Sequence, residues 1–573
     1  MSEPASQWDG DTALLVVLAG LASVVSFLIY FRNGDILLFG DAVGHTNIAR
    51  RVFDSRTPGL LQLGTVWLPL PHLLMIPFVA SNGAWRTGLG GSLPSMAAFV
   101  FAVQGIFRLV RGAGLGRMTA WMAAAFFGLN PNLLYLQATA MTETLYLALF
   151  VWAMVYFGEL LRDRSEVGCG ESARRSLWRC GACLLAACLT RYDGWFVAAV
   201  MGAIVVLLAF VRRGEWRAAG LFLLLAGIGP VSWLTYNAAV YGNALEFANG
   251  PYSARAIELR GTLAGLPPHP GDGNVLAAAS YFLKAGQLNV AEGNWGRWWL
   301  GLAVAGSMAG IVVGCARRQL SAKGGAQERA PHTLLLLWLS LPFYILSVAY
   351  GGVPVFTPQW WPFSLYNVRY GVQLVPAMAV FCAISVGILA SLRREKWVRT
   401  AVASVAVAFA AASYVGVWRA QPVCYREAWV NSRTRIQLER SVAEQLQRFP
   451  ANATFLMYLG EHVGAFQDAG IPLARVISEG NHPMGRQPPD PEGLWERALA
   501  DPGKYADFAI AFEGDPVWKA LHERGLPVLT IIAVNGQKRA TIYRTREAPK
   551  LSQVTMQVNR VTKLAEEAGF YWR

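Results

Sequence analysis

The chain has 573 residues, of which 54% are hydrophobic and only 15% are charged. A soluble domain carries about 25% charged residues, so this composition excludes a string of soluble domains and favours a membrane protein with many spans. The same apolar content excludes a disordered chain. The net charge is +14, but the basic residues cluster in short stretches between apolar segments. That pattern indicates a topology signal rather than a nucleic-acid surface.

A membrane-spanning helix needs about 20 consecutive apolar residues. The sequence predicts eleven such segments, which makes the expected fold class an α-helical polytopic membrane protein. The predicted spans, in chain order, are Ala13–Phe31, Gly88–Phe107, Met118–Leu136, Thr144–Gly158, Leu177–Thr190, Gly194–Val211, Ala218–Tyr236, Trp298–Ala316, Thr333–Tyr350, Tyr370–Leu392 and Thr400–Trp418.

The basic residues predict the orientation of these spans. Nineteen of the 50 Lys and Arg lie in five stretches, at 108–117, 162–179, 212–217, 317–329 and 393–399. Alternate threading of the spans puts all five on one side, which the positive-inside rule identifies as the cytoplasm. The amino terminus is then cytoplasmic. Residues 32–87, 237–297, 351–369 and the tail 419–573 face the outside.

The carboxyl-terminal tail differs in kind from the apolar part. Short strands are predicted at Ala453–Leu459, Phe508–Phe512, Val528–Val534 and Ala540–Tyr543, and helices at Arg433–Phe449, Pro491–Leu499 and Val517–Arg524. Alternation of strand and helix is typical of an α/β domain. We therefore expect two domains: a transmembrane domain at 1–418, with outer loops 32–87 and 237–297, and an extracytoplasmic α/β domain at 419–573.

Charged residues at membrane depth are candidates for function because they are costly there. Three of them lie at the predicted outer ends of spans, namely Glu143, Arg191 and Arg369. Eleven residues separate Arg179 from Arg191, and a helix of that length covers about 17 Å of a core of about 30 Å. Arg191 and Asp193 are therefore expected to be recessed from the outer face. They either close a tight helical hairpin as a pair or bind a ligand.

The first outer loop is the densest polar segment. Asp41 and His45 are four residues apart, so a helix would place both on one face. Capping that helix is the structural alternative for Asp41. The apolar stretch 63–78 carries three prolines, so it is expected to be a broken interfacial segment. Its His72 is either a ligand or an ordinary interfacial residue.

These motifs together resemble the GT-C glycosyltransferases, which take a sugar from a polyprenyl-phosphate carrier. The resemblance is to the branch of protein O-mannosyltransferases, lipid A aminoarabinose transferases and bacterial Rgt-type transferases, and it covers roughly residues 12–418. The motifs that carry it are the acidic loop with Ala-Arg-Arg (Asp41 to Arg51), Thr142-Glu143, Arg191-Tyr-Asp-Gly-Trp195 and Arg369-Tyr370.

Two features depart from the pattern of that branch. Many members carry Asp-Glu in the first loop, whereas Ala42 follows Asp41 here, which removes one carboxylate from any metal site built on that pair. The aminoarabinose branch has a Lys that meets the donor phosphate. No Lys precedes Lys284 in this chain, so His72 or an Arg would have to serve.

The resemblance implies transfer of a sugar from a polyprenyl-phosphate donor to a hydroxyl of a glycan, lipid or protein. One carboxylate must accept the proton of the attacking hydroxyl, and cations must hold the leaving phosphate. We expect Asp41 as the general base of an inverting displacement, with Glu143 as the second catalytic candidate. The expected donor-binding residues are Arg191, Arg369, His72 and Tyr370, and the expected acceptor or supporting residues are His45, Arg50 and Asp193.

No cofactor is required by this reaction, although a divalent metal is compatible with it. The expected location is a cell or inner membrane, and no nucleic-acid partner is expected. The competing function is a transporter or flippase of a lipid-linked sugar. Transporters place their sites near the midplane on repeated, interrupted helices, whereas the charged residues here lie at the outer ends of spans that show no repeat.

Overall fold

The computed structural model describes residues 5–163, 171–211, 216–321, 331–392, 395–481 and 493–546. Within them the chain forms two compact units. The first comprises residues up to Ala49 and Thr65–Asn431, and the second comprises Arg50–Gly64 and residues from Ser432 on. Helix α19 (Val423–Leu446) therefore contributes its first residues to one unit and the remainder to the other.

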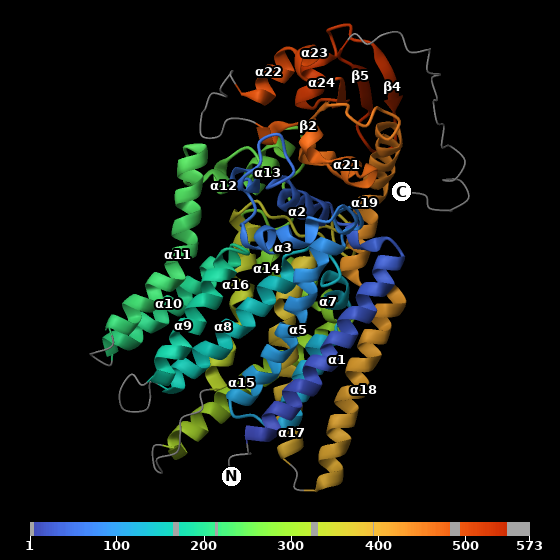
Figure 1. Cartoon of the computed structure of the whole chain (residues 1–573). Helices are drawn as coiled ribbons and strands as arrows, with labels where there is room; N and C mark the ends of the chain where they lie inside the picture. Colours follow the sequence, from blue (N-terminus) through green and yellow to red (C-terminus); the bar gives the residue numbers. More distant parts are fainter. Residues whose placement is uncertain are drawn as a thin grey trace. The chain divides into compact units, whose positions relative to one another are not determined.

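The first unit is a bundle of long apolar helices with shorter helices between them (Figure 1). Its helices are α1 Ala5–Arg32, α2 Gly40–Arg51, α3 Leu70–Val79, α4 Asn82–Thr87, α5 Leu89–Gly112, α6 Arg117–Gly128, α7 Pro131–Leu136, α8 Glu143–Asp163, α9 Glu171–Cys188, α10 Asp193–Val211, α11 Trp216–Tyr241, α12 Glu246–Asn249, α13 Ala254–Leu263, α14 Val275–Val290, α15 Trp295–Ser321, α16 Ser340–Tyr350, α17 Val375–Ser391, α18 Lys396–Ala420 and the start of α19. Two 3₁₀ segments, η3 Pro331–Leu339 and η4 Val368–Leu374, lead into α16 and α17.

Each of the eleven predicted spans coincides with helical structure. In the described part of the chain, eight helices are long and apolar enough to cross a membrane. The predicted span Met118–Leu136 is interrupted, because Asn130 accepts hydrogen bonds from the backbone of Asn132 and Leu133 and Pro131 opens the new helix α7. The predicted break in 63–78 is present, since α3 begins only at Leu70.

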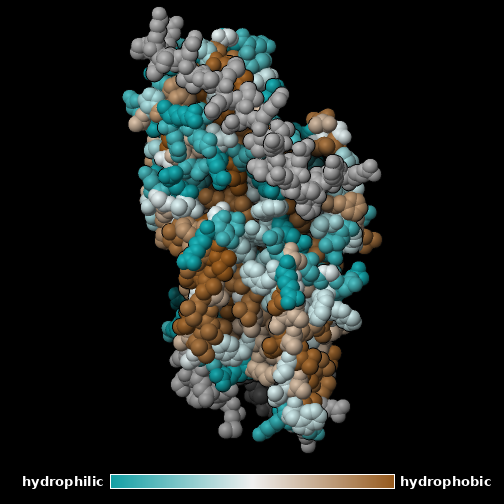
Figure 2. All heavy atoms as spheres, turned by 90° about the vertical axis from the view of Figure 1, so that its right-hand side faces the viewer, coloured by the Kyte–Doolittle hydropathy of each residue, from teal (hydrophilic) through white to brown (hydrophobic). Residues whose placement is uncertain are grey.

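The outward faces of the long helices are apolar. Helix α1 exposes Leu18, Leu21 and Val25, and α18 exposes Val405. On the face shown in Figure 2, hydrophobic side chains gather over the long helices. Exposed apolar surface of this extent is typical of helices that contact lipid. The chain is thus an integral membrane protein with several spans.

The second unit contains a five-stranded sheet with the order β2-β1-β3-β5-β4. Strands β1 (Phe455–Met457), β2 (Val476–Ile477) and β3 (Phe508–Phe512) are parallel. Strand β5 (Ala540–Arg544) is antiparallel to β3 and to β4 (Val528–Ile532). The four predicted strands are present, and β2 was not predicted because two residues carry no readable period. Helices α22 (Leu494–Ala500) and α24 (Pro516–Leu521) pack on the sheet.

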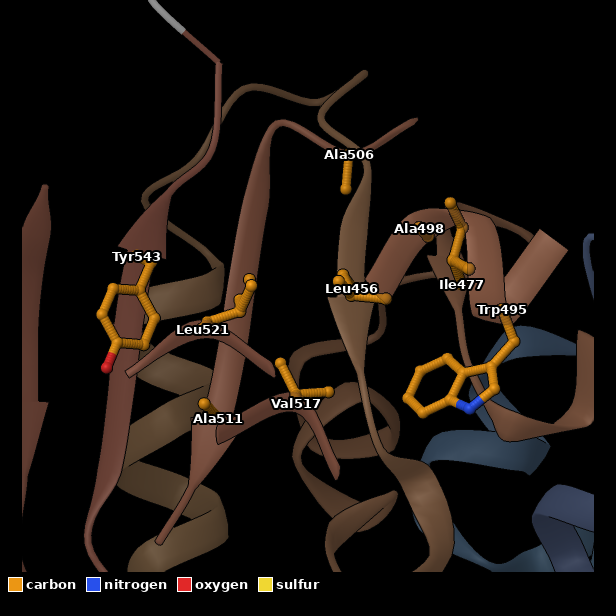
Figure 3. Close-up of a cluster of buried hydrophobic side chains, with 10 residues drawn as sticks. Leu456, Ile477, Trp495, Ala498, Ala506, Ala511, Val517, Leu521 and Tyr543 are labelled. Carbon is orange, nitrogen blue, oxygen red and sulfur yellow. The ribbon is translucent and has the colours of Figure 1, made fainter. Parts of the chain in front are cut away.

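The core of this unit lies between the sheet and those helices. Leu456, Trp495, Val517, Leu521 and Tyr543 belong to one cluster of buried side chains there (Figure 3). Burial of such side chains contributes about 1.5–3 kcal/mol each.

Residues 50–64 of the first outer loop belong to the second unit. Gln62 donates to the carbonyl of Gly480 at 2.7 Å, and Asp54 accepts from the amide of Ala474 at 2.9 Å. The sequence analysis assigned this segment to the transmembrane domain. Its partners lie about 420 residues later in the chain, and contacts over such a separation leave no pattern in the local sequence.

Candidate active site

The charged residues singled out from the sequence converge in the first unit. Asp41 lies in the first turn of α2, Glu143 begins α8, Arg191 lies in the turn between α9 and α10, and Arg369 lies in η4. They are joined by Glu427 in the first turns of α19. Four predicted site residues, far apart in sequence, therefore occupy one cluster.

Arg369 contacts carboxylates on three sides. Its guanidinium donates to Asp41, donates to Glu427 at 2.9 Å and lies 3.4 Å from Glu143. Glu427 also accepts from the backbone amides of Arg369 and Asn367, each at 2.9 Å. One buried carboxylate thus fixes both the side chain of Arg369 and the backbone that carries it.

Arg191 has a different set of partners. It donates to the hydroxyl of Tyr344 at 2.7 Å and to the hydroxyl of Thr142 at 3.0 Å. The carboxylates of Glu143 and Asp193 lie farther away, each at 3.4 Å. The predicted Arg191–Asp193 pair is present, and it is part of a larger network.

Tyr370 lies between the two arginines. The guanidinium carbons of Arg191 and Arg369 are 5.3 Å and 5.1 Å from the centre of its ring. These are cation–π distances. Tyr370 therefore lies beside both arginines, and its predicted contact with the donor stays a prediction.

The carboxylates of the cluster differ in exposure. The side chains of Glu143, Asp193 and Glu427 are each 1% exposed, whereas that of Asp41 is 38% exposed. Asp41 is consequently the carboxylate of this cluster that a molecule at the protein surface can reach. Helix α2 begins at Gly40, so Asp41 lies inside its first turn rather than at the residue that precedes it.

The two predicted histidines form a pair. Nδ1 of His45 lies 2.9 Å from Nε2 of His72, both side chains are buried, and the ring of Trp67 lies 4.3 Å from that of His45. Burial, together with the positive charges of Arg191 and Arg369, lowers the pKa of His45 to about 3. His45 is therefore neutral at physiological pH. It lies close enough to Arg191 and Arg369 for their charges to act on it. A contact of His72 with a donor phosphate stays a prediction.

Arg50 belongs to the second unit, where it forms an ion pair with Asp54 at 2.7 Å. Its supporting role at the acceptor stays a prediction.

Glu427 and Tyr344 were not predicted as site residues. Glu427 lies in a segment that the sequence analysis assigned to the exported tail. Tyr344 lies in an apolar span, where a tyrosine by itself does not indicate a functional site. Glu427 could have been found only from its position: a carboxylate on the first turns of the helix that follows the last span.

No group of three or more His, Cys, Asp or Glu side chains in the described residues is arranged to hold a metal ion. Three of the carboxylates instead surround the guanidinium of Arg369.

No protein-family model matches the sequence, and no curated protein matches it. Solved structures do match its fold. The crystal structure of ArnT from Cupriavidus metallidurans bound to undecaprenyl phosphate has a TM-score of 0.52 and 13% identity, and the match covers 96% of this chain and 100% of that one. The apo form of ArnT gives a TM-score of 0.54 at 13% identity, over 95% and 99% of the two chains.

A third structure, the oligosaccharyltransferase AglB from Archaeoglobus fulgidus in complex with an inhibitory peptide and a dolichol-phosphate, has a TM-score of 0.43 and 13% identity. That match covers 87% of this chain and 69% of that one. The likeness to ArnT extends over nearly the whole of both chains and establishes the fold. The chain has the GT-C fold, as the sequence motifs predicted.

Proposed function

We propose that this GT-C-fold protein is a glycosyltransferase that moves a hexosyl or pentosyl group from a polyprenyl-phosphate carrier to an acceptor hydroxyl. The observation that carries the proposal is the cluster itself: one buried and one partly buried arginine beside a carboxylate that is 38% exposed. A solved structure of the same fold, ArnT, binds undecaprenyl phosphate. That ligand carries a phosphate group, and the guanidinium groups of arginines bind phosphate oxygens through paired hydrogen bonds.

Asp41 is the proposed general base. Its exposure allows an acceptor hydroxyl to approach it, whereas Glu143, Asp193 and Glu427 are enclosed. Glu143 lies between the two arginines at 3.4 Å from each, so its proposed role is to orient them. It is the second candidate for the base.

Arg191 and Arg369 are the proposed ligands of the donor phosphate, with Tyr370 holding the two guanidinium groups side by side. A phosphate oxygen that binds Arg369 competes with Asp41 for the same guanidinium. Donor binding would therefore loosen the Asp41–Arg369 ion pair and leave the Asp41 carboxylate free to accept the proton of the acceptor hydroxyl.

The proposed reaction is a single inverting displacement. The acceptor oxygen forms a bond to the anomeric carbon while the bond from that carbon to the phosphate oxygen breaks. The hydroxyl proton passes to Asp41, and the leaving polyprenyl phosphate keeps the electron pair of the broken bond. The two arginines stabilise the negative charge that develops on the phosphate. His45, Asp193 and Arg50 are proposed as supporting residues, and His72 as a further donor contact.

Transfer can be tested with the purified protein in lipid nanodiscs and a labelled polyprenyl-phosphate sugar. Release of polyprenyl phosphate that depends on an added acceptor supports the proposal. In sealed vesicles, movement of the label between leaflets without release would instead identify a carrier and overturn it. Asp272→Asn serves as a control, since Asp272 is an exposed carboxylate of the outer loop 237–297.

We further propose that the reaction occurs at the outer face of the membrane, with the amino terminus in the cytoplasm and the second unit outside. The five basic stretches support this orientation. A reporter that is active only in the cytoplasm should be silent when it is fused after Arg573. An active reporter would mean that the number of crossings is even.

A further inference from the structure

The loop that precedes Arg369 carries a group of exposed aromatic side chains. They are Trp360, Trp361, Phe363 and Tyr366, which are 36%, 48%, 64% and 46% exposed. Large aromatic side chains gathered on one exposed loop are a common mark of a binding surface.

The loop is held in place at several points. The backbones of Phe356 and Tyr366 exchange two hydrogen bonds, and the hydroxyl of Tyr281 donates to the carbonyl of Trp361 at 2.6 Å. Asn431 donates to the carbonyl of Leu365 at 2.8 Å. The aromatic side chains therefore project from a fixed backbone.

Phe363 adopts a left-handed conformation with φ of 57°. This conformation is unfavourable for a bulky residue, and such residues persist where the surroundings or a function require them. Here it places an aromatic ring on the outside of the loop, where it is the most exposed of the four.

The loop adjoins the candidate active site. Tyr366 is three residues before Arg369. Between these two residues, the backbone amide of Asn367 donates a hydrogen bond to Glu427. Partial burial raises the pKa of the Tyr366 phenol, and the charge of Asp41 raises it further. The loop thus leads directly into the segment that carries Arg369, whose guanidinium donates to Asp41.

We propose that residues 356–366 form the acceptor subsite and that the acceptor is a carbohydrate. This inference rests on the proposed transferase function. The C–H groups of a sugar ring carry a small positive charge and pack on the negative face of an aromatic ring. A sugar packed on Trp361 and Tyr366 would present its hydroxyl groups toward Asp41.

The character of the loop favours a carbohydrate over a lipid chain. A lipid tail needs flexible aliphatic surface, and the exposed aliphatic residues near this region lie instead on α13, as Ile257, Leu259 and Leu263. Rigid aromatic side chains with polar edges suit a ligand that is apolar on its ring faces and polar at its rim.

The test measures binding without donor or turnover. The full-length protein in nanodiscs is titrated with the methyl glycosides of glucose, galactose, mannose and N-acetylglucosamine, and with a Ser/Thr peptide. Saturation transfer from protein to ligand reports contact with ring C–H groups. We expect at least one glycoside to bind, and Trp361→Leu and Tyr366→Leu to weaken it about tenfold each. Trp361→Phe and Tyr366→Phe should retain most of the binding.

Leucine keeps apolar volume and removes the aromatic face, so a surface that only contacts lipid would tolerate it. Trp298→Leu, at an exposed tryptophan of α15, is the control and should bind like the wild type. The proposal is overturned if no glycoside binds, if the Leu variants bind equally well, or if the peptide binds in their place. Quenching of Trp361 fluorescence by brominated lipids would also overturn it, because the loop would then lie in the bilayer.

The transferase function and the carbohydrate acceptor can be refuted independently of each other. A protein that binds glycosides through these rings but releases no polyprenyl phosphate contradicts the transferase function alone. A protein that transfers sugar to the peptide and binds no glycoside contradicts the carbohydrate acceptor alone.

Discussion

Arg191 and Arg369 carry the same guanidinium group, but their partners differ in charge. The shortest hydrogen bonds of Arg369 go to the carboxylates of Asp41 and Glu427, whereas those of Arg191 go to two neutral hydroxyls, on Thr142 and Tyr344. The carboxylates nearest Arg191 are 3.4 Å away. The positive charge of Arg369 is therefore largely neutralised within the protein, and that of Arg191 is more available to an anion.

This difference separates two tasks that the sequence could not distinguish. Arg369 ties α2, η4 and α19 together through Asp41 and Glu427. Arg191 is oriented mainly by two hydroxyls, and its two carboxylate partners lie at the longer distance of 3.4 Å, where they neutralise its charge less. We infer that Arg191 supplies more of the affinity for phosphate and that Arg369 couples phosphate binding to Asp41.

The largest expected effect comes from Asp41→Asn. The amide keeps the size of the side chain but cannot accept the proton, and loss of a general base costs about 10²–10⁴ in rate. We expect near-complete loss of transfer with donor binding retained, as measured by release of polyprenyl phosphate. A variant that keeps more than roughly a tenth of the wild-type rate would show that the base lies elsewhere, with Glu143 the next candidate.

Replacing the arginines sharpens the comparison. Arg191→Ala and Arg369→Ala should each weaken binding of labelled polyprenyl phosphate by a few kcal/mol, as for loss of charge-assisted hydrogen bonds, roughly 1.5–3 kcal/mol each. The loss should be greater for Arg191, since its charge is less neutralised. Arg369→Ala should in addition lower the thermal stability, because Glu427 is left buried without its partner.

Arg260→Ala, on the exposed surface of α13, is the matched control and should bind the lipid phosphate normally. Unchanged donor affinity in both site variants, in stably folded protein, would refute their contact with the phosphate. A larger loss for Arg369 would reverse the assignment of the two tasks.

Tyr344→Phe tests the neutral partners of Arg191. The hydroxyl accepts from Arg191 at 2.7 Å and donates to Asp193 at 3.2 Å. Its removal should cost about 1.5–3 kcal/mol of unfolding free energy, as for hydrogen bonds to charged groups. Tyr350→Phe, at an exposed tyrosine of the same helix, should cost nothing measurable. Equal stabilities of the two variants would show that the hydroxyl of Tyr344 does not hold Arg191.

The smallest expected effect is a pH dependence through His45. Its pKa is about 3 in the folded protein, against about 6.5 for an unperturbed histidine. Because the folded pKa is lowered, the unfolded chain takes up a proton first as the pH falls below 6.5. Stability is then lost progressively down to about pH 3. Between pH 7.5 and pH 5.5 we expect a loss of about 1.4 kcal/mol.

Thermal denaturation at the two pH values measures this effect. His45→Gln should remove most of the difference, whereas His522→Gln, in the second unit, should leave it in place. A wild-type midpoint that does not change between the two pH values would mean that His45 is not neutralised by its surroundings.

The sequence predicted most of the helical architecture because the long apolar runs are a local signal. It also selected Glu143, Arg191 and Arg369 as candidates, since isolated charges at the ends of apolar segments are costly without a partner. Asp41 was selected from the polar first loop and from the family resemblance. The ion-pair partners of these residues could not be predicted from the sequence. Which carboxylate meets which guanidinium depends on how distant segments fold together.

Glu427 illustrates this limit. It lies in a helix of mixed composition, where a glutamate on the surface would be unremarkable. Its burial follows from the packing of α19 against η4, which no periodicity reveals. The same is true of residues 50–64, whose hydrogen bonds with residues 474–481 join segments that the sequence assigned to different domains.

The cluster around Arg369 also bears on how the protein is made. Asp41 precedes Arg369 by 328 residues, and Glu427 follows it by 58. During synthesis Arg369 is therefore inserted before the carboxylate that fixes its backbone has left the ribosome. Until Glu427 arrives, η4 lacks its anchor, and a chain that ends early keeps a charged side chain incompletely paired at the start of an apolar helix. The ion pairs of this cluster thus close only after Glu427 has been translated. A chain truncated before that residue differs structurally from the finished protein, and the cell's proteolytic quality control can recognise the difference.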